Sequence, residues 1–211
     1  MRLLLGVLAL TALVAASGSG GATARPESLP YYEAPTFTPS WSGTAHRVAP
    51  FRLRTQTGAV LTNDDLAGKI HVASFIYTRC SAICPTLVAN LRRVSTAITD
   101  PRLVFVSYSV TPDLDTPEVL ADFGREHHID ADRWKLVTGD ARQIYALARD
   151  SYFASDERLR ETLSTSDAFL HTEQVVLVDG SGRIRGVYNG TQPFEMTHLT
   201  SDIKSLLLDA R

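Results

Sequence analysis

The stretch IHVASFIYTRCSAICPTLVAN, residues 70–90, decides how the rest of the chain is interpreted. It opens with an apolar run at 70–78, which is typical of a strand buried on both faces of a sheet. Cys80 and Cys84, the two cysteines of the chain, follow at once. Pro85 is tolerated in a first helical turn, so a helix is expected to begin between Ser81 and Cys84. Active sites of open α/β sheets collect at the carboxyl ends of strands, which favours a functional cysteine pair.

Strands and helices alternate along the chain on both sides of this stretch. The patterns predict a hairpin at 48–62, strands at 70–78 and 102–110, a strand and turn at 134–140, paired strands at 173–190, and helices at 64–69, 86–99, 115–128, 140–152 and 194–210. This order predicts an α/β domain over residues 46–211, with a central mixed sheet flanked by helices. Residues 25–45 carry prolines and aromatics without either regular period, and are expected to form an extended arm over the domain.

Composition excludes one class of partner. The 211 residues are 44% hydrophobic and 21% charged, with a formal net charge of −2. Such values are ordinary for a globular domain with a sizeable core. The sequence holds no basic cluster interleaved with aromatics, so a nucleic-acid partner is not expected.

The first 24 residues resemble a secretory signal peptide. Arg2 supplies a positive start, residues 3–16 form an apolar core, and Ala22-Thr23-Ala24 matches an A-x-A cleavage site. The apolar run is shorter than the roughly 20 residues that span a bilayer. We therefore expect an exported, periplasmic protein, with an uncleaved membrane anchor as the alternative. Such a compartment is oxidising, so keeping two free thiols there takes a reductase, a metal or both.

The spacing of the cysteines permits both redox and metal chemistry. Residues four apart at a helix start have Cα atoms about 6 Å apart, within reach of a disulfide. The helix N-terminus favours thiolate over thiol. Two thiolates are too few for a closed zinc site or a cysteine-ligated iron–sulfur cluster. A third ligand, most simply histidine, would complete a three-coordinate Cu(I) site.

Six histidines could supply that ligand, and five of them have ordinary structural explanations: His46 in the arm, His71 in a strand, His127 and His128 at a helix C-terminus, and His198 in the last helix. His171 differs because it lies in a loop just before the strand at 173–178. From position alone, a ligand role and a structural role for His171 are equally supported.

Four stretches together resemble the Sco/SenC family, the thioredoxin-fold copper proteins of cytochrome c oxidase assembly. They are FIYTRCSAICPTL (75–87), VSYSVTPDLDTPEVLADF (106–123), WKLVTGDARQIYALA (134–148) and FLHTEQVVLVDGSGRIRGVYNGT (169–191). The resemblance runs from about Pro50 to the C-terminus. It implies a thioredoxin-like fold in which Cys80, Cys84 and His171 bind copper. The chain has Leu170 and Thr111 where the family often has Asp, which concerns the surroundings of the histidine.

The resemblance implies a copper chaperone that binds one copper ion per chain, as Cu(I) or Cu(II). The expected acceptor is the CuA site of cytochrome c oxidase subunit II, whose cysteines the protein would also reduce. A thiol reductase would keep Cys80 and Cys84 reduced. The alternative function is a periplasmic thiol–disulfide oxidoreductase or redox sensor, in which Cys80 and Cys84 form a redox-active pair. A structural domain with one inert disulfide is the third interpretation.

Overall fold

A seven-stranded mixed sheet forms the centre of the molecule in the computed structural model, which describes residues 28–42, 45–154 and 173–209. The strands are β1 (Arg52–Thr55), β2 (Val60–Thr62), β3 (Ile70–Ile76), β4 (Leu103–Ser109), β5 (Trp134–Thr138), β6 (Gln174–Val178) and β7 (Ile184–Asn189), in the order β2-β1-β5-β4-β3-β6-β7. β3, β4 and β5 are parallel neighbours, and the other pairs are antiparallel. The α/β class, the mixed sheet and the thioredoxin-like fold predicted from the sequence are confirmed.

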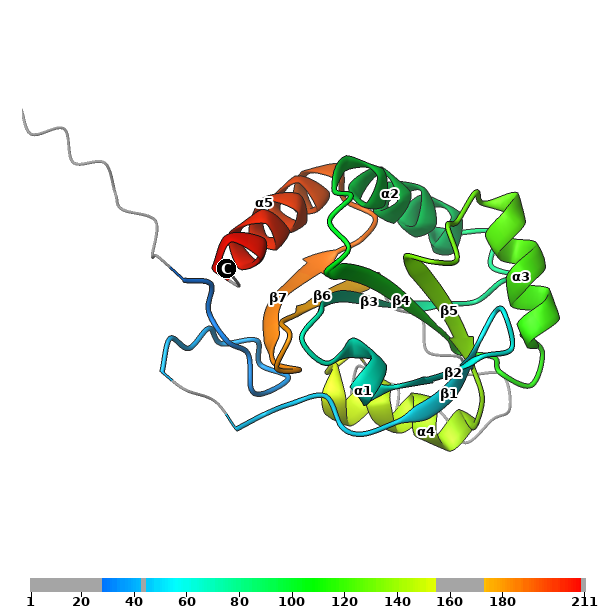
Figure 1. Cartoon of the computed structure of the whole chain (residues 1–211), viewed down its shortest axis with the longest axis horizontal. Coiled ribbons are helices and arrows are strands. Elements are labelled where there is room, and N and C mark those ends of the chain that lie inside the picture. Colours follow the sequence, from blue (N-terminus) through cyan, green and yellow to red (C-terminus); the bar gives the residue numbers. More distant parts are fainter. Residues whose placement is uncertain (1–27, 43–44, 155–172, 210–211) are drawn as a thin grey trace, which may run out of the picture.

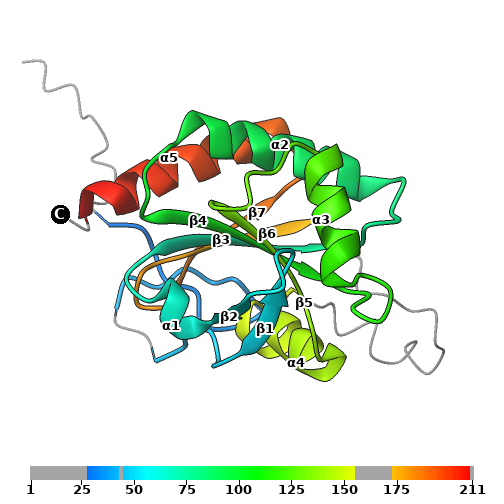
Figure 2. The ribbon, with the colours of Figure 1, turned by 45° about the vertical axis from the view of Figure 1, so that its right-hand side comes forward.

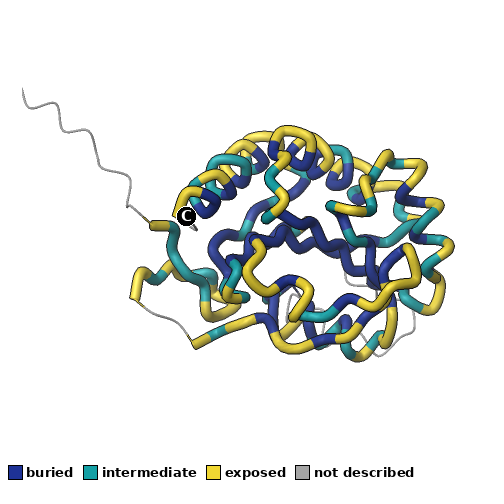
Figure 3. The backbone as a smooth tube through the Cα atoms, in the orientation of Figure 1, coloured by how far each residue is buried: buried dark blue, intermediate teal, exposed yellow. Residues whose placement is uncertain are grey.

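Helices cover both faces of the sheet. α2 (Ile83–Ala97), α3 (Pro117–Glu126) and α5 (Pro193–Asp209) lie on one face, and α1 (Asn63–Leu66) and α4 (Ala141–Ala146) lie on the other (Figures 1 and 2). Two separate apolar clusters fill the spaces between the sheet and these helices. The central strands β3 and β4 are buried along their whole length (Figure 3). This is why both read as continuous apolar runs rather than as alternating patterns.

Local sequence signals account for most of the element boundaries. Thr116 caps α3 by accepting a hydrogen bond from the N–H of Val119, and Pro117 occupies the first turn. Asp140 caps α4 in the same way through the N–H of Gln143. The β1–β2 hairpin turns at Gly58, whose φ of 79° suits glycine. The elements predicted from these signals agree with the structure within a few residues.

The helix predicted at 140–152 differs in its second half. After Ala146 the chain continues as a π-helical turn, η1 (Leu147–Ser151), in which the N–H of Tyr152 bonds to the carbonyl of Leu147. The wider turn brings Tyr152 into the core, where it is fully buried. There its hydroxyl lies 2.7 Å from that of Tyr108 and 3.3 Å from Nε2 of His71. Periodicity in the sequence does not distinguish such a π turn from an α-helix.

The described part of the predicted arm, residues 28–42, is held against β7 and the β6–β7 turn. The N–H of Tyr32 bonds to the carbonyl of Ile184, and the guanidinium of Arg185 donates to the carbonyls of Leu29 and Pro30. Arg185 also lies over the Tyr31 ring, 4.1 Å from its centroid. The proposed signal segment, residues 1–24, lies outside the described residues. None of the helices in the described part of the chain is long and apolar enough to span a membrane.

Candidate metal centre

Cys80 and Cys84 lie where β3 passes into α2. β3 ends at Ile76, a turn closes with a hydrogen bond from the N–H of Cys80 to the carbonyl of Tyr77, and α2 begins at Ile83. The helix start is within the range predicted from Pro85. Both cysteines are free thiols. Cys80 is partly exposed, whereas Cys84 is only 6% exposed, so one sulfur faces the surroundings and the other faces the core.

The start of α2 lowers the pKa of the Cys80 thiol and so favours its thiolate form. Partial burial raises its pKa, but the backbone N–H groups of Cys84, Ala82 and Ile83 and the thiol of Cys84 donate hydrogen bonds to the sulfur. Their combined effect is larger, and the pKa of Cys80 lies below its ordinary value. This is the expected effect of unpaired N–H groups at a helix N-terminus on a neighbouring sulfur.

Cys84 is shifted in the opposite direction. Burial raises the pKa of its thiol to about 11, although a hydrogen bond from the backbone of Tyr77 partly opposes this. The sulfur of Cys80 and the carboxylate of Asp115 raise it further. The pair is therefore asymmetric: Cys80 is the more accessible and more readily ionised thiol, and Cys84 is the buried thiol that holds its proton more tightly.

A buried carboxylate beside the cysteines was not predicted from the sequence. Asp115, in the connection from β4 to α3, is 0% exposed and accepts hydrogen bonds from three hydroxyls. Thr78 donates to one carboxylate oxygen at 2.5 Å, and Ser109 and Thr111 donate to the other at 2.6 and 3.0 Å. The signal was an acidic residue directly before the Thr116-Pro117 cap, at the carboxyl end of a buried strand next to β3.

His171 lies outside the described residues, so its predicted place at the site stays a prediction. Among residues 28–42, 45–154 and 173–209, no three His, Cys, Asp or Glu side chains gather in a way that could hold a metal ion. Two of the other histidines have structural contacts: His46 bonds to the carbonyl of Ser151, and His127 is the residue at the end of α3. His71 is buried in β3.

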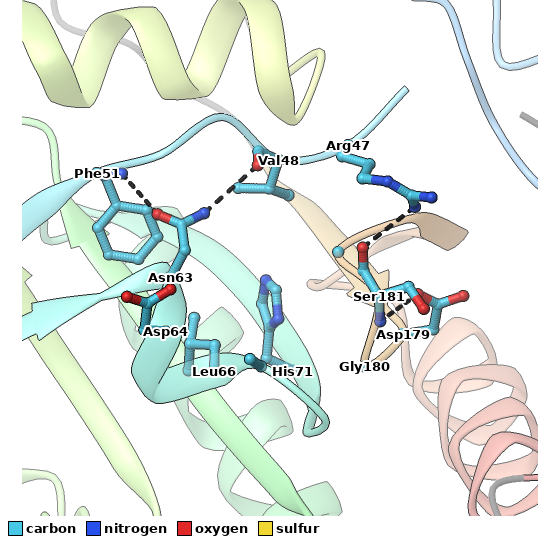
Figure 4. A pocket seen from close by; sticks show the side chains of 12 residues that line it. Arg47, Val48, Phe51, Asn63, Asp64, Leu66, His71, Asp179, Gly180 and Ser181 are labelled. Carbon is cyan, nitrogen blue, oxygen red and sulfur yellow. Dashed lines mark hydrogen bonds between the residues drawn. The ribbon is translucent and has the colours of Figure 1, made fainter. Parts of the chain in front are cut away.

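A hollow of about 240 Å³ lies near the amino end of β3, away from the cysteines. It is bordered by α1, the turn at 179–182 and the chain before β1 (Figure 4). His71 lines it, and its Nδ1 has no hydrogen-bond partner among the described residues. Asp179 also lines it, but that carboxylate is already bonded to Arg183 and Arg185. The hollow therefore offers one histidine and no metal-binding cluster.

Comparisons with known proteins show the family of the chain. The SCO1/SenC family profile matches residues 40–208, which is most of the chain. The chain belongs to the SCO1/SenC family. It is 28% identical to the SCO1 protein homolog of Bacillus subtilis over 165 residues, which is 76% of this chain and 82% of the relative. It is 30% identical to the human mitochondrial SCO1 homolog over 106 residues, covering 47% of this chain and 34% of that one.

Solved Sco structures share the fold. A SCO1/SenC family lipoprotein from Bacillus anthracis is 27% identical with a TM-score of 0.66, covering 77% of this chain and 95% of that one. BsSco is 26% identical with a TM-score of 0.63, covering 76% of this chain and 93% of that one. It is a member of the Sco family of cytochrome c oxidase assembly proteins, and a disulfide switch has been identified in it. ScoI of Bradyrhizobium japonicum, solved with copper bound, is 24% identical with a TM-score of 0.59, covering 77% and 99%. Sco proteins are thus linked to copper binding and to cytochrome c oxidase assembly.

Proposed function

We propose that this Sco protein is a copper chaperone that binds one copper ion through Cys80, Cys84 and His171. It delivers the ion to the CuA site of cytochrome c oxidase subunit II. The observation that carries the proposal is the asymmetric thiol pair at the start of α2, with a lowered pKa at Cys80 and a buried partner at Cys84. Two soft thiolates and an imidazole suit Cu(I), and copper is the metal bound in related Sco structures.

The strand topology supports His171 as the third ligand. β6 runs antiparallel to β3, with Val175 opposite Ser74. The chain therefore approaches β6 from the carboxyl edge of the sheet, where β3 leads to Cys80. His171 is three residues before Gln174, the first residue of β6. Three residues span at most about 10 Å, a distance that is compatible with a ligand supplied by His171 at this edge.

Loading and transfer follow from the unequal thiols. Copper first meets the thiolate of Cys80, which is partly exposed, and binding at Cys84 then releases the proton that burial holds there. An acceptor thiolate displaces the ligands in turn. Cys80 leaves before Cys84, because Cys80 is partly exposed whereas Cys84 is buried. The copper ion is the cargo, and its oxidation state does not change in this exchange.

The same pair can reduce the acceptor's cysteines. The Cys80 thiolate attacks a disulfide of the acceptor, which forms a mixed disulfide and releases one acceptor thiolate. Cys84 then attacks Cys80, which releases the second acceptor thiolate and leaves a Cys80–Cys84 disulfide. Two electrons pass to the acceptor, and a thiol reductase returns them to the pair. A thiol–disulfide oxidoreductase would use this step alone, and it is the second candidate function.

Export places this chemistry outside the cytoplasm. We propose that residues 1–24 direct the chain to the periplasm and that the mature protein begins near Arg25. N-terminal sequencing of the exported protein tests this. Protein that retains Met1 in the membrane fraction would instead support an anchored form.

His171→Ala separates the two candidate functions, because a dithiol reductase needs the cysteines but not the histidine. We expect the variant to keep disulfide reductase activity, to bind Cu(I) more weakly, and to fail in restoring oxidase activity in a deletion strain. His198→Ala is the matched control, since His198 is exposed on α5. Full restoration of oxidase by His171→Ala would favour the oxidoreductase.

A further inference from the structure

We propose that Asp115 is a positioning residue that holds the cysteine loop in place through the hydroxyl of Thr78. The inference deepens the proposed function, because it rests on Cys80 as the accessible thiolate of the pair. It concerns how the fold keeps the Cys80 sulfur over the first N–H groups of α2.

One oxygen of the Asp115 carboxylate is held by residues outside the cysteine loop. Ser109, the last residue of β4, and Thr111 both donate to the same carboxylate oxygen. The backbone N–H of Asp115 bonds to the carbonyl of Thr111, which closes a turn. Directly afterwards, Thr116 caps α3. The carboxylate is therefore held by a strand end, a turn and a helix start.

The other oxygen of this carboxylate accepts a hydrogen bond from the cysteine loop. The parallel register of β3 and β4 places Ile76 beside Ser109, so the two loops leave the sheet next to each other. Thr78, two residues after β3, donates its hydroxyl to Asp115 at 2.5 Å. The turn that follows closes from the N–H of Cys80 to the carbonyl of Tyr77. A fixed Thr78 thus fixes the turn that presents Cys80.

Burial strengthens the hydrogen bond between Thr78 and Asp115. Asp115 is 0% exposed, so water does not compete for the hydroxyl donors, and an unmade bond to a buried carboxylate is costly. Three neutral hydroxyls satisfy the carboxylate, and two of them belong to its own segment. The third comes from the cysteine loop, so the loop stays in register with the β4–α3 connection. Loss of the Thr78 hydroxyl frees the loop while leaving two donors on Asp115.

The test is the pH profile of Cys80 alkylation by iodoacetamide in the reduced, copper-free protein, with the modified cysteine identified by peptide mass spectrometry. Thr78→Val should let the Cys80 sulfur move away from the first N–H groups of α2, which lowers its alkylation rate at neutral pH about threefold. Thr78→Ser keeps the hydroxyl and should restore the rate. Thr111→Val is the matched control, because it removes another hydroxyl from Asp115 without touching the cysteine loop, and should leave the profile unchanged.

A Thr78→Val profile equal to that of the wild type would overturn the proposal. So would equal slowing by Thr111→Val or by Thr78→Ser, since either result would show that the hydroxyl on the cysteine loop is not what matters. If Thr78→Val does not fold by circular dichroism, Thr78→Ala repeats the test without placing a methyl group against the carboxylate. The assay contains no copper, so failure of copper binding in the wild type would contradict the proposed function and leave this result standing.

Discussion

At the scale of single residues, the unequal environments of two sulfurs organise the chemistry. Cys80 meets three N–H groups and has a lowered pKa, whereas burial raises the pKa of Cys84 to about 11. One C-x-x-x-C motif therefore supplies an accessible thiolate and a protected thiol. The motif alone indicates a helix start, but the difference between the two sulfurs depends on which of them faces the core.

Replacement of either cysteine should largely abolish copper retention. Cys80→Ser or Cys84→Ser removes half of the thiolate donors, and a hydroxyl is a poor ligand for Cu(I). We expect one copper per chain in the reduced wild type and well below that in each variant after dialysis against a competing chelator. Atomic absorption with a protein assay measures the ratio. Wild-type stoichiometry in either variant would place the metal elsewhere.

His71 should make stability depend on pH. Burial lowers the pKa of its imidazole to about 4, against the opposing effect of Asp179, while the unfolded chain keeps a value near 6.5. Between these values the unfolded chain binds a proton that the folded chain does not. The stabilisation is thus complete above about pH 6.5 and is lost as the pH falls toward 4. From pH 7 to about 5 the loss is about 2 kcal/mol.

Urea unfolding of the wild type and of His71→Leu at the two pH values isolates this contribution. The variant has no imidazole to protonate at this position. The decrease in its free energy of unfolding from pH 7 to about 5 should therefore be smaller than that of the wild type by about 2 kcal/mol. Equal changes in the two proteins would show that other groups carry the pH dependence.

At the scale of elements, the site depends on how the ends of three elements meet. Gly190 follows β7, donates its N–H to the carbonyl of Glu173 just before β6, and accepts a hydrogen bond from the buried side chain of Asn90 in α2. The strand end is thus joined to the helix that carries Cys84 and to the segment that follows His171. Asn90 is one of the few buried polar residues of α2, and this hydrogen bond explains why a polar side chain is buried there.

Gly190→Ala should disturb this junction. A Cβ there would lie 2.7 Å from Cγ2 of Val175 and 3.1 Å from the carbonyl oxygen of Glu173, which is too close. We expect a loss of about 1–3 kcal/mol in the free energy of unfolding, measured by urea denaturation.

Gly124→Ala is the control for this change. Its Cβ would meet a side chain of Leu136 at 3.4 Å, an ordinary contact, and α3 gains a better helix former. We expect that variant to be neutral or slightly more stable. Similar destabilisation by the two variants would argue against a special role of the Gly190 junction.

At the scale of the whole molecule, the buried Arg185 makes several of the contacts that attach the N-terminal arm to the sheet. Arg185 in β7 bonds to the carbonyls of Leu29 and Pro30, stacks on Tyr31, and pairs with Asp179 in the β6–β7 turn. Arg183 lies over the same Tyr31 ring, 4.7 Å from its centroid, so both arginines contact the arm. The attachment lies far from the cysteines in the sequence but joins the chain's first described residues to the sheet.

Arg185→Leu should release the arm from the domain. It removes hydrogen bonds from a charged donor, worth about 1.5–3 kcal/mol each, while Arg183 still pairs with Asp179. We expect limited proteolysis to cut within residues 28–42 at least about tenfold faster than in the wild type, as followed by mass spectrometry. Arg125→Leu, which breaks an exposed pair on α3, should not change the cleavage rate. An unchanged rate in Arg185→Leu would mean that other contacts hold the arm.

Sequence alone determined the class of the fold, the helix start at the cysteines and the family. These depend on local signals, namely apolar runs, caps and the fixed spacing of Cys80, Cys84 and Pro85. Tertiary structure decided the rest: the burial of Cys84, the carboxylate of Asp115 between two loops, and the π turn that brings Tyr152 to His71. Each of these needs residues brought together by strand pairing, and a pKa or a buried hydrogen bond depends on such neighbours rather than on residues adjacent in the chain.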